Sequence, residues 1–104
     1  MEKRTPHYAL SRVKELIRRG AYRATRTALQ CAIRDFGYIE AGQLAGFVLT
    51  IESKHFYKSM TTLHDSTLWQ DVYRPKIEGA LAYVKVQIVD NTTVVISFKR
   101  LEDK

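Results

Sequence analysis

The spacing of the apolar residues changes once along this chain, and this change limits the possible folds more than any other feature. Up to about residue 51 the apolar residues recur every three or four positions, which is the period of a helix that buries one face. From Leu68 onward they recur at every second position, which is the period of a strand. Helices followed by strands are typical of an α+β fold. We therefore predict two or three N-terminal helices packed on one face of a mainly antiparallel C-terminal sheet.

Capping residues predict where the helices begin and end. Thr5 followed by Pro6 is a typical helix start, and it predicts a first helix over residues 6–19 that a glycine ends. Thr25 can cap a second helix over residues 25–36, which a glycine also ends. A third helix is indicated by residues at helical spacing, namely Leu44, Phe47, Val48 and Ile51.

The last two strands are predicted over residues 80–89 and 93–99, joined by a three-residue loop. Their apolar, helix-facing residues would be Ala82, Val84, Val86 and Ile88 in the first strand and Val94, Ile96 and Phe98 in the second. The facing pairs would be Val84 with Phe98, Val86 with Ile96 and Val89 with Thr93. This register places Tyr83 opposite Lys99 on the polar side. The next register that matches the faces is less favourable, because it would place Lys85 opposite Lys99.

The strand before this hairpin leaves two orientations open. Trp69 and Tyr73 alternate with Gln70 along it. If the two large aromatic residues join the helix-covered side, Gln70 falls on the polar side beside Tyr83 and Lys99. We expect this orientation and keep the opposite one as the alternative.

The charge of the chain favours a nucleic-acid partner. Its 104 residues include 17 Lys and Arg against 11 Asp and Glu, a formal net charge of +6. On a small surface this charge attracts polyanions. A chain of this length has room for one domain, expected to span residues 1–104. No stretch is apolar enough to span a membrane, and none follows the N-terminal charges, so a cytoplasmic protein without membrane contact is expected.

The cysteine and histidine residues do not predict a metal site. Cys31 is the single cysteine, so it has no partner for an internal disulfide, and it is expected to be buried on the second helix. His55 and His64 have no Cys or second His at metal-binding spacing. A glycine-rich phosphate loop is also absent from the sequence. We therefore expect neither a metal ion nor a cofactor.

RNA can be cut without a metal ion when its own 2′-hydroxyl attacks the adjacent phosphorus. This reaction needs a proton acceptor, a cation near the crowded phosphorane, and a proton donor for the leaving 5′-oxygen. Tyr83 is a candidate for proton transfer, because Lys99 beside it would favour the phenolate. Lys58 and Lys99 are suited to hold a phosphoryl oxygen, and Gln70 can orient the ribose or the phosphate. Arg74 is a candidate phosphate anchor.

Several segments are similar to the MqsR family of small bacterial toxins. They are MEKRTPH at 1–7, TRTAL at 25–29, FYKSMTT at 56–62, WQDVYRP at 69–75 and SFK at 97–99. The resemblance implies a RelE-like α+β fold and the toxin of a type II toxin–antitoxin system, an endoribonuclease that cleaves mRNA at GC-containing triplets such as GCU. It also implies an antitoxin partner with a zinc-binding N-terminal domain and a DNA-binding C-terminal domain.

The resemblance also implies which residues act. The catalytic residues would be Lys58, Gln70, Tyr83 and Lys99. The RNA-binding residues would be Tyr57, Met60 and His7, to which the residue chemistry adds Arg74. The chain departs from the family pattern in the loop 63–67, where the family histidine falls nearer Ser66. His64 is therefore not assigned a role, and the preferred triplet stays open.

Other interpretations fit the same residues. The basic face could hold RNA without cutting it, and a Tyr–Lys pair on a strand is commonly a solvated pair without function. A DNA-binding regulator is less favoured: the helices 6–19 and 25–36 are spaced like a helix-turn-helix, but no third helix of clear pattern supports them. An antitoxin is expected to extend or cover a strand edge near residues 68–74 or 93–99.

Overall fold

The computed structural model describes residues 1–101 and confirms the α+β class, while the last three residues of the expected domain 1–104 lie outside the described part. The helices are α1 (Leu10–Arg18), α2 (Arg26–Phe36) and α3 (Ala41–Val48), with a 3-10 turn η1 (Ser53–His55). The strands are β1 (Glu2–Lys3), β2 (Tyr22–Ala24), β3 (Phe56–Thr61), β4 (Trp69–Tyr73), β5 (Lys76–Ile77), β6 (Ala80–Val89) and β7 (Thr92–Arg100).

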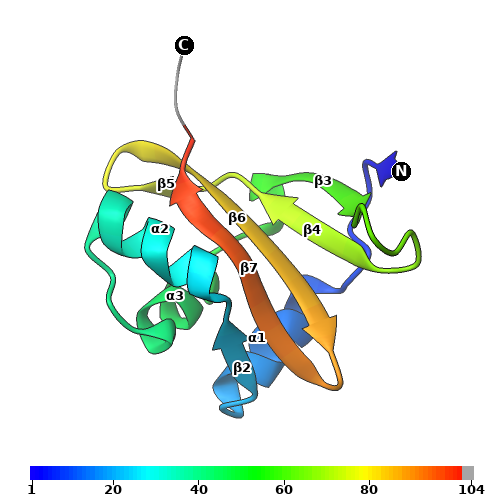
Figure 1. Ribbon diagram of the computed structural model, residues 1–104, viewed down its shortest axis with the longest axis horizontal. Coiled ribbons are helices and arrows are strands. Elements are labelled where there is room, and N and C mark those ends of the chain that lie inside the picture. Colours follow the sequence, from blue (N-terminus) through cyan, green and yellow to red (C-terminus); the bar gives the residue numbers. More distant parts are fainter. Residues whose placement is uncertain (102–104) are drawn as a thin grey trace.

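The helices cover one face of the sheet and leave the other open. Within residues 1–101 the main sheet has the order β1-β3-β4-β6-β7-β2, and β5 pairs with β6. Neighbouring strands are antiparallel except β2 and β7, which are parallel. Figure 1 shows α1, α2 and α3 gathered beside the long β6–β7 hairpin. The buried core contains residues of all three helices together with Val84 and Val86 of β6 and Phe98 of β7.

The β6–β7 hairpin confirms the predicted pairing at its open end. Tyr83 lies opposite Lys99, and Val84 lies opposite Phe98. Val84 and Phe98 are completely buried against the helices. Since neighbouring side chains along a strand point to opposite faces, Tyr83 and Lys99 are directed away from the helices.

The register near the turn differs from the prediction. The loop has two residues, Asp90 and Asn91, with φ of 50° and 56°, which is typical of a type I′ turn. A register shift between Lys85 and Val86 then restores the predicted pairing. The observed pairs in the shifted part are Val89 with Thr92, Ile88 with Thr93, Gln87 with Val94 and Val86 with Val95. A bulge reverses the alternation of faces, so Val95 packs in the core in place of the predicted Val94 and Ile96.

The first helix starts later than predicted, at Leu10 and not at residue 6. The cause is Asp71, whose buried carboxylate accepts the backbone N–H of His7 at 3.0 and 3.1 Å and that of Tyr8 at 2.9 Å. These bonds tie residues 7 and 8 to β4, and Ala9 precedes the helix in an extended conformation (φ −61°, ψ 126°). The Thr-Pro signal is therefore overridden by a contact with a distant strand.

The caps of α2 are confirmed. Thr25 Oγ1 accepts the backbone N–H of Ala28 at 3.1 Å, and Gly37 ends the helix in the left-handed conformation with φ of 73°. Cys31 on this helix is half-buried and not buried as expected. The third helix ends before Ile51, although Ile51 itself is completely buried.

Three strands at or next to the edges of the sheet were not predicted: β1, β2 and β3. The strand β2 pairs with β7 and separates α1 from α2, so these helices do not form a helix-turn-helix. The strand β4 lies between β3 and β6, so the predicted edge near residues 68–74 is wrong. The strand β7 is covered by β2 from Thr93 to Val95.

Candidate active site

Alternation along the strands places three lysines among polar and apolar side chains on the sheet face that the helices leave uncovered. We call this face the open face, and its residues include Lys58, Met60, Gln70, Val72, Tyr83, Lys85, Gln87, Ser97 and Lys99. Lys58 pairs with Val72, which in turn pairs with Lys85. The strand registers therefore bring lysines from three separate strands, β3, β6 and β7, around Tyr83.

Tyr83 lies at the centre of the open face. Its hydroxyl is 4.0 Å from Met60 Sδ on β3, so its side chain extends across β4, where Val72 is completely buried. Lys99 Nζ lies 5.3 Å and Lys85 Nζ 5.8 Å from the centre of the Tyr83 ring. Both cations thus lie near the ring of Tyr83.

The protonation of Tyr83 differs from the expectation that Lys99 would favour its phenolate. Burial raises the pKa of Tyr83, and Lys58 opposes this rise without cancelling it. Lys99 is placed over the ring and does not lower this pKa, because the negative charge of a phenolate would develop on the oxygen. Tyr83 therefore keeps its proton at neutral pH and is suited to donate it.

Lys58 is held by a carboxylate that sequence reasoning missed. Its Nζ donates to Glu2 Oε2 at 2.7 Å, and its side chain is only 18% exposed. This hydrogen bond raises the pKa of Lys58 and lowers that of Glu2. Glu2 reaches the site because β1 pairs with β3 and places Glu2 opposite Met60. No local signal could have revealed this contact, because a strand of two residues has no measurable period.

Lys85 is a second residue that the sequence analysis did not assign to the site. It is half-buried between Val72 on β4 and Ser97 on β7. Burial lowers the pKa of its ammonium group, and the nearby charges of Lys99 and Lys58 add to this effect. The alternation of β6 could have identified it, because Lys85 lies on the same side of that strand as Tyr83.

Gln70 lies on the open face, as the preferred orientation predicted, but not beside Tyr83 and Lys99. It pairs with Met60 on β3, and its Nε2 donates to Gln87 Oε1 at 3.0 Å. The register of β4 against β6 aligns it with Gln87. Met60 therefore lies between Gln70 and the hydroxyl of Tyr83. The hydrogen bond to Gln87 holds the side-chain amide of Gln70 in one orientation.

Tyr57 and Arg74 form a cationic cluster at one side of the open face. A register shift at Tyr57, between Phe56 and Lys58, interrupts the regular pairing of β3. Arg74 Cζ lies 4.5 Å from the centre of the Tyr57 ring, Lys58 Nζ 5.4 Å and Arg4 Cζ 5.6 Å. Such contacts hold cations near an aromatic ring. The cluster offers both a ring for stacking and charges for phosphates.

His7 is not brought to the open face. Its ring stacks on Trp69 with centroids 5.5 Å apart and planes 16° apart, and its Nδ1 lies 3.0 Å from Lys3 Nζ. Trp69 lies on the same side of β4 as the buried Tyr73, opposite to Gln70. His7 therefore supports the N-terminal segment on the other side of the sheet.

Two further observations on the described residues concern metal binding and membrane-spanning helices. In residues 1–101, no group of three His, Cys, Asp or Glu side chains is placed to hold a metal ion. None of the helices in this part of the chain has the length and apolar content that a membrane span requires.

Comparison with known proteins gives the class of this protein. The family described as "Motility quorum-sensing regulator, toxin of MqsA" matches residues 5–100. The match spans both the helical layer and the sheet that carries the open face. The class of this protein is therefore that of toxins that act together with a partner protein, the antitoxin.

The chain belongs to the MqsR toxin family. The mRNA interferase toxin MqsR of Escherichia coli (strain K12) is 41% identical to it over 99 residues, which cover 95% of this chain and 98% of the relative. The protein is therefore a toxin and an endoribonuclease.

Proposed function

We propose that this toxin cleaves mRNA on the open face through attack of the 2′-hydroxyl on the adjacent phosphorus, without a metal ion. One observation carries the proposal: Lys58, Lys85 and Lys99 lie around the phenol of Tyr83 on a face that the helices of residues 1–101 leave uncovered. Of these, Lys58 and Lys99 are the cations that lie where charge grows, and such cations stabilise the transition state. The 2′-oxygen bonds to phosphorus as the bond to the 5′-oxygen breaks, which leaves a 2′,3′-cyclic phosphate and a 5′-hydroxyl.

The charge states of these side chains support separate roles. Lys58, kept charged by Glu2, and Lys99 hold the phosphoryl oxygens. Tyr83 retains its proton and gives it to the leaving 5′-oxygen. Lys85 accepts the proton of the 2′-hydroxyl in those molecules in which its amine is neutral, a fraction that burial and the charges of Lys99 and Lys58 increase by lowering its pKa.

The remaining residues of the site bind the sugar–phosphate backbone and the bases of the RNA. Gln70, oriented by Gln87, contacts the ribose or phosphate next to the scissile bond. Tyr57 and Met60 contact bases, and Arg74 binds a phosphate. The preference for GC-containing triplets such as GCU is proposed from the family resemblance alone. His7 is left out of the contact set, because it stacks on Trp69 on the other side of the sheet.

The partner we propose is an antitoxin with a zinc-binding N-terminal domain and a DNA-binding C-terminal domain, as the family resemblance implies. The zinc would belong to that partner. The outer edge of β7 between Ile96 and Arg100 is a candidate contact, since β2 pairs with β7 only from Thr93 to Val95. At the two ends of this stretch, the Ile96 carbonyl accepts a hydrogen bond from Thr25 Oγ1 and the Arg100 N–H donates to Asp35. Metal analysis of this chain without its partner should find no tightly bound zinc, and one equivalent of zinc would contradict this assignment.

The test is cleavage of naked RNA by the purified protein in EDTA. We expect cleavage to continue and the fragments to carry 2′,3′-cyclic phosphate and 5′-hydroxyl ends. A complete loss on chelation that a divalent ion restores would overturn the mechanism. Binding without cleavage would favour an RNA-binding module instead, in which single replacements of Lys58 or Lys99 weaken affinity modestly.

A further inference from the structure

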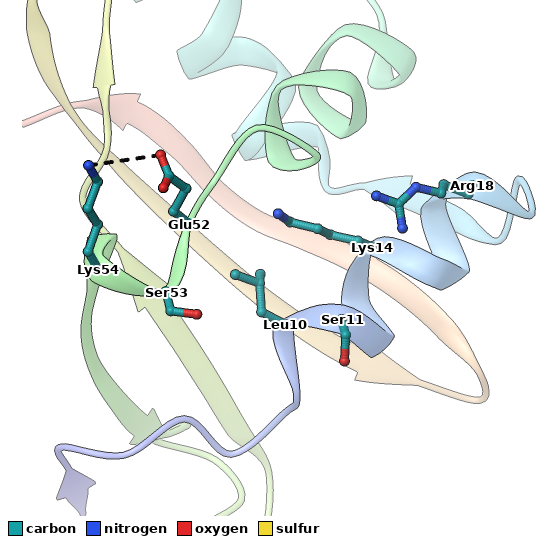
Figure 2. A pocket seen from close by; sticks show the side chains of 7 residues that line it. All are labelled: Leu10, Ser11, Lys14, Arg18, Glu52, Ser53 and Lys54. Carbon is teal, nitrogen blue, oxygen red and sulfur yellow. Dashed lines mark ion pairs between the residues drawn. The ribbon is translucent and has the colours of Figure 1, made fainter.

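A second basic region lies away from the open face, in a groove between α1 and the segment before β3. The groove has a volume of about 550 Å³. Its lining residues are Leu10, Ser11, Lys14, Arg18, Glu52, Ser53 and Lys54. Figure 2 shows Lys14 and Arg18 extending from α1 on the side of the segment that carries Glu52. We call this region the α1 groove.

Cations dominate the charge of the α1 groove. Its one carboxylate, Glu52, lies 4.0 Å from Lys54 Nζ and is offset by it. On the same helix Glu15 pairs with Arg12 and Arg19. Within residues 1–101, Lys14 and Arg18 form no ion pair, so the groove presents two uncompensated positive charges.

A smaller cavity shares Lys54 with the α1 groove and is also lined by residues next to the candidate active site. This cavity has a volume of about 300 Å³ and is lined by Lys54, His55, Phe56, Tyr57, Arg74 and Leu81. Lys54 lines both hollows, while Tyr57 and Arg74 belong to the cationic cluster beside Lys58. Positive side chains therefore follow one another from the open face, past Arg74 and Lys54, to Lys14 and Arg18.

We propose that an RNA strand that leaves the open face continues over Tyr57 and Arg74 into the α1 groove, where Lys14 and Arg18 hold its phosphates. This inference rests on the proposed ribonuclease function. The α1 groove has no aromatic side chain for base stacking, so it binds the backbone and is insensitive to sequence. Its lining also lacks the Trp and Tyr side chains that, together with Arg, most often anchor protein partners, which favours RNA over a protein in this groove.

The proposal predicts that the α1 groove matters for long RNA and not for short RNA. The test compares kcat/KM for a substrate of about 5 nucleotides and one of about 25 nucleotides that contain the same cleavage triplet. The double variant Lys14→Ala/Arg18→Ala should lower the long-to-short ratio of kcat/KM by on the order of tenfold, through KM. The matched control is Arg23→Ala/Arg26→Ala, which removes the same charge from exposed positions outside both hollows and should keep the parental ratio.

Binding of an RNA made uncleavable by a 2′-deoxy sugar at the scissile position provides an independent readout. Removing two phosphate contacts should reduce the slope of log affinity against log salt for the long RNA by about 1.4, at about 0.7 for each contact on a single strand. An unchanged ratio and slope would overturn the RNA path. Reduced neutralisation by the antitoxin with unchanged RNA binding would also overturn it and assign the groove to that protein. If the parent cuts neither RNA, the proposed function fails, whereas the salt slope still decides the path.

Discussion

Replacing Tyr83 by Phe should separate the chemistry of this protein from its folding. The hydroxyl has Met60 Sδ at 4.0 Å as its contact, and thioether sulfur is a weak acceptor, so its loss should cost less than about 1 kcal/mol of stability. The Phe ring can keep its place beside Lys85 and Lys99. Loss of the proton donor should slow cleavage at least about a hundredfold, equivalent to about 2.7 kcal/mol in the barrier.

The control lies on the opposite face of the same strand. Val84 is completely buried, so Val84→Ala should cost on the order of 1–3 kcal/mol of stability while a folded sample still cuts at the parental rate. Single-turnover cleavage of a labelled RNA measures the rate, and urea unfolding measures the stability. The reasoning is refuted if Tyr83→Phe cleaves like the parent. A large loss of stability in Tyr83→Phe would instead show that its environment is misassigned.

Two further predictions concern the buried groups of β4. Asp71→Asn should lower the free energy of unfolding by about 1.5–3 kcal/mol in urea titrations, because the charged carboxylate that accepts the His7 and Tyr8 backbone N–H groups is lost. An unchanged free energy of unfolding would contradict the role of Asp71 in holding residues 7 and 8 against β4. Burial raises the pKa of Tyr73 to about 12, so the unfolded chain, with its ordinary pKa of about 10, ionises first. The stability that Tyr73 provides in its neutral form is thus fully present below about pH 10 and is lost as pH rises toward 12. In urea titrations, the free energy of unfolding of Tyr73→Phe should therefore fall less between these pH values than that of the parent. An equal fall in both proteins would count against this assignment.

The sequence by itself determined the features that depend on neighbouring residues. The change of period predicted the α+β class, and Thr25 and Gly37 marked α2 because their side chain and backbone act within one helical turn. Alternation placed Tyr83 opposite Lys99, since side chains on a strand change face at every residue. The central pair of the candidate site could therefore be predicted from the order of the residues alone.

Contacts between distant segments decided the rest. Asp71 holds residues 7 and 8 out of the first helix, and Glu2 reaches Lys58 across 56 positions in the sequence, so neither effect leaves a local pattern. The shift between Lys85 and Val86 depends on how a two-residue turn meets the core. The pKa changes of Tyr83 and Lys85 arise from burial. Burial is a property of the assembled sheet, because the atoms that exclude water from each side chain come from other strands.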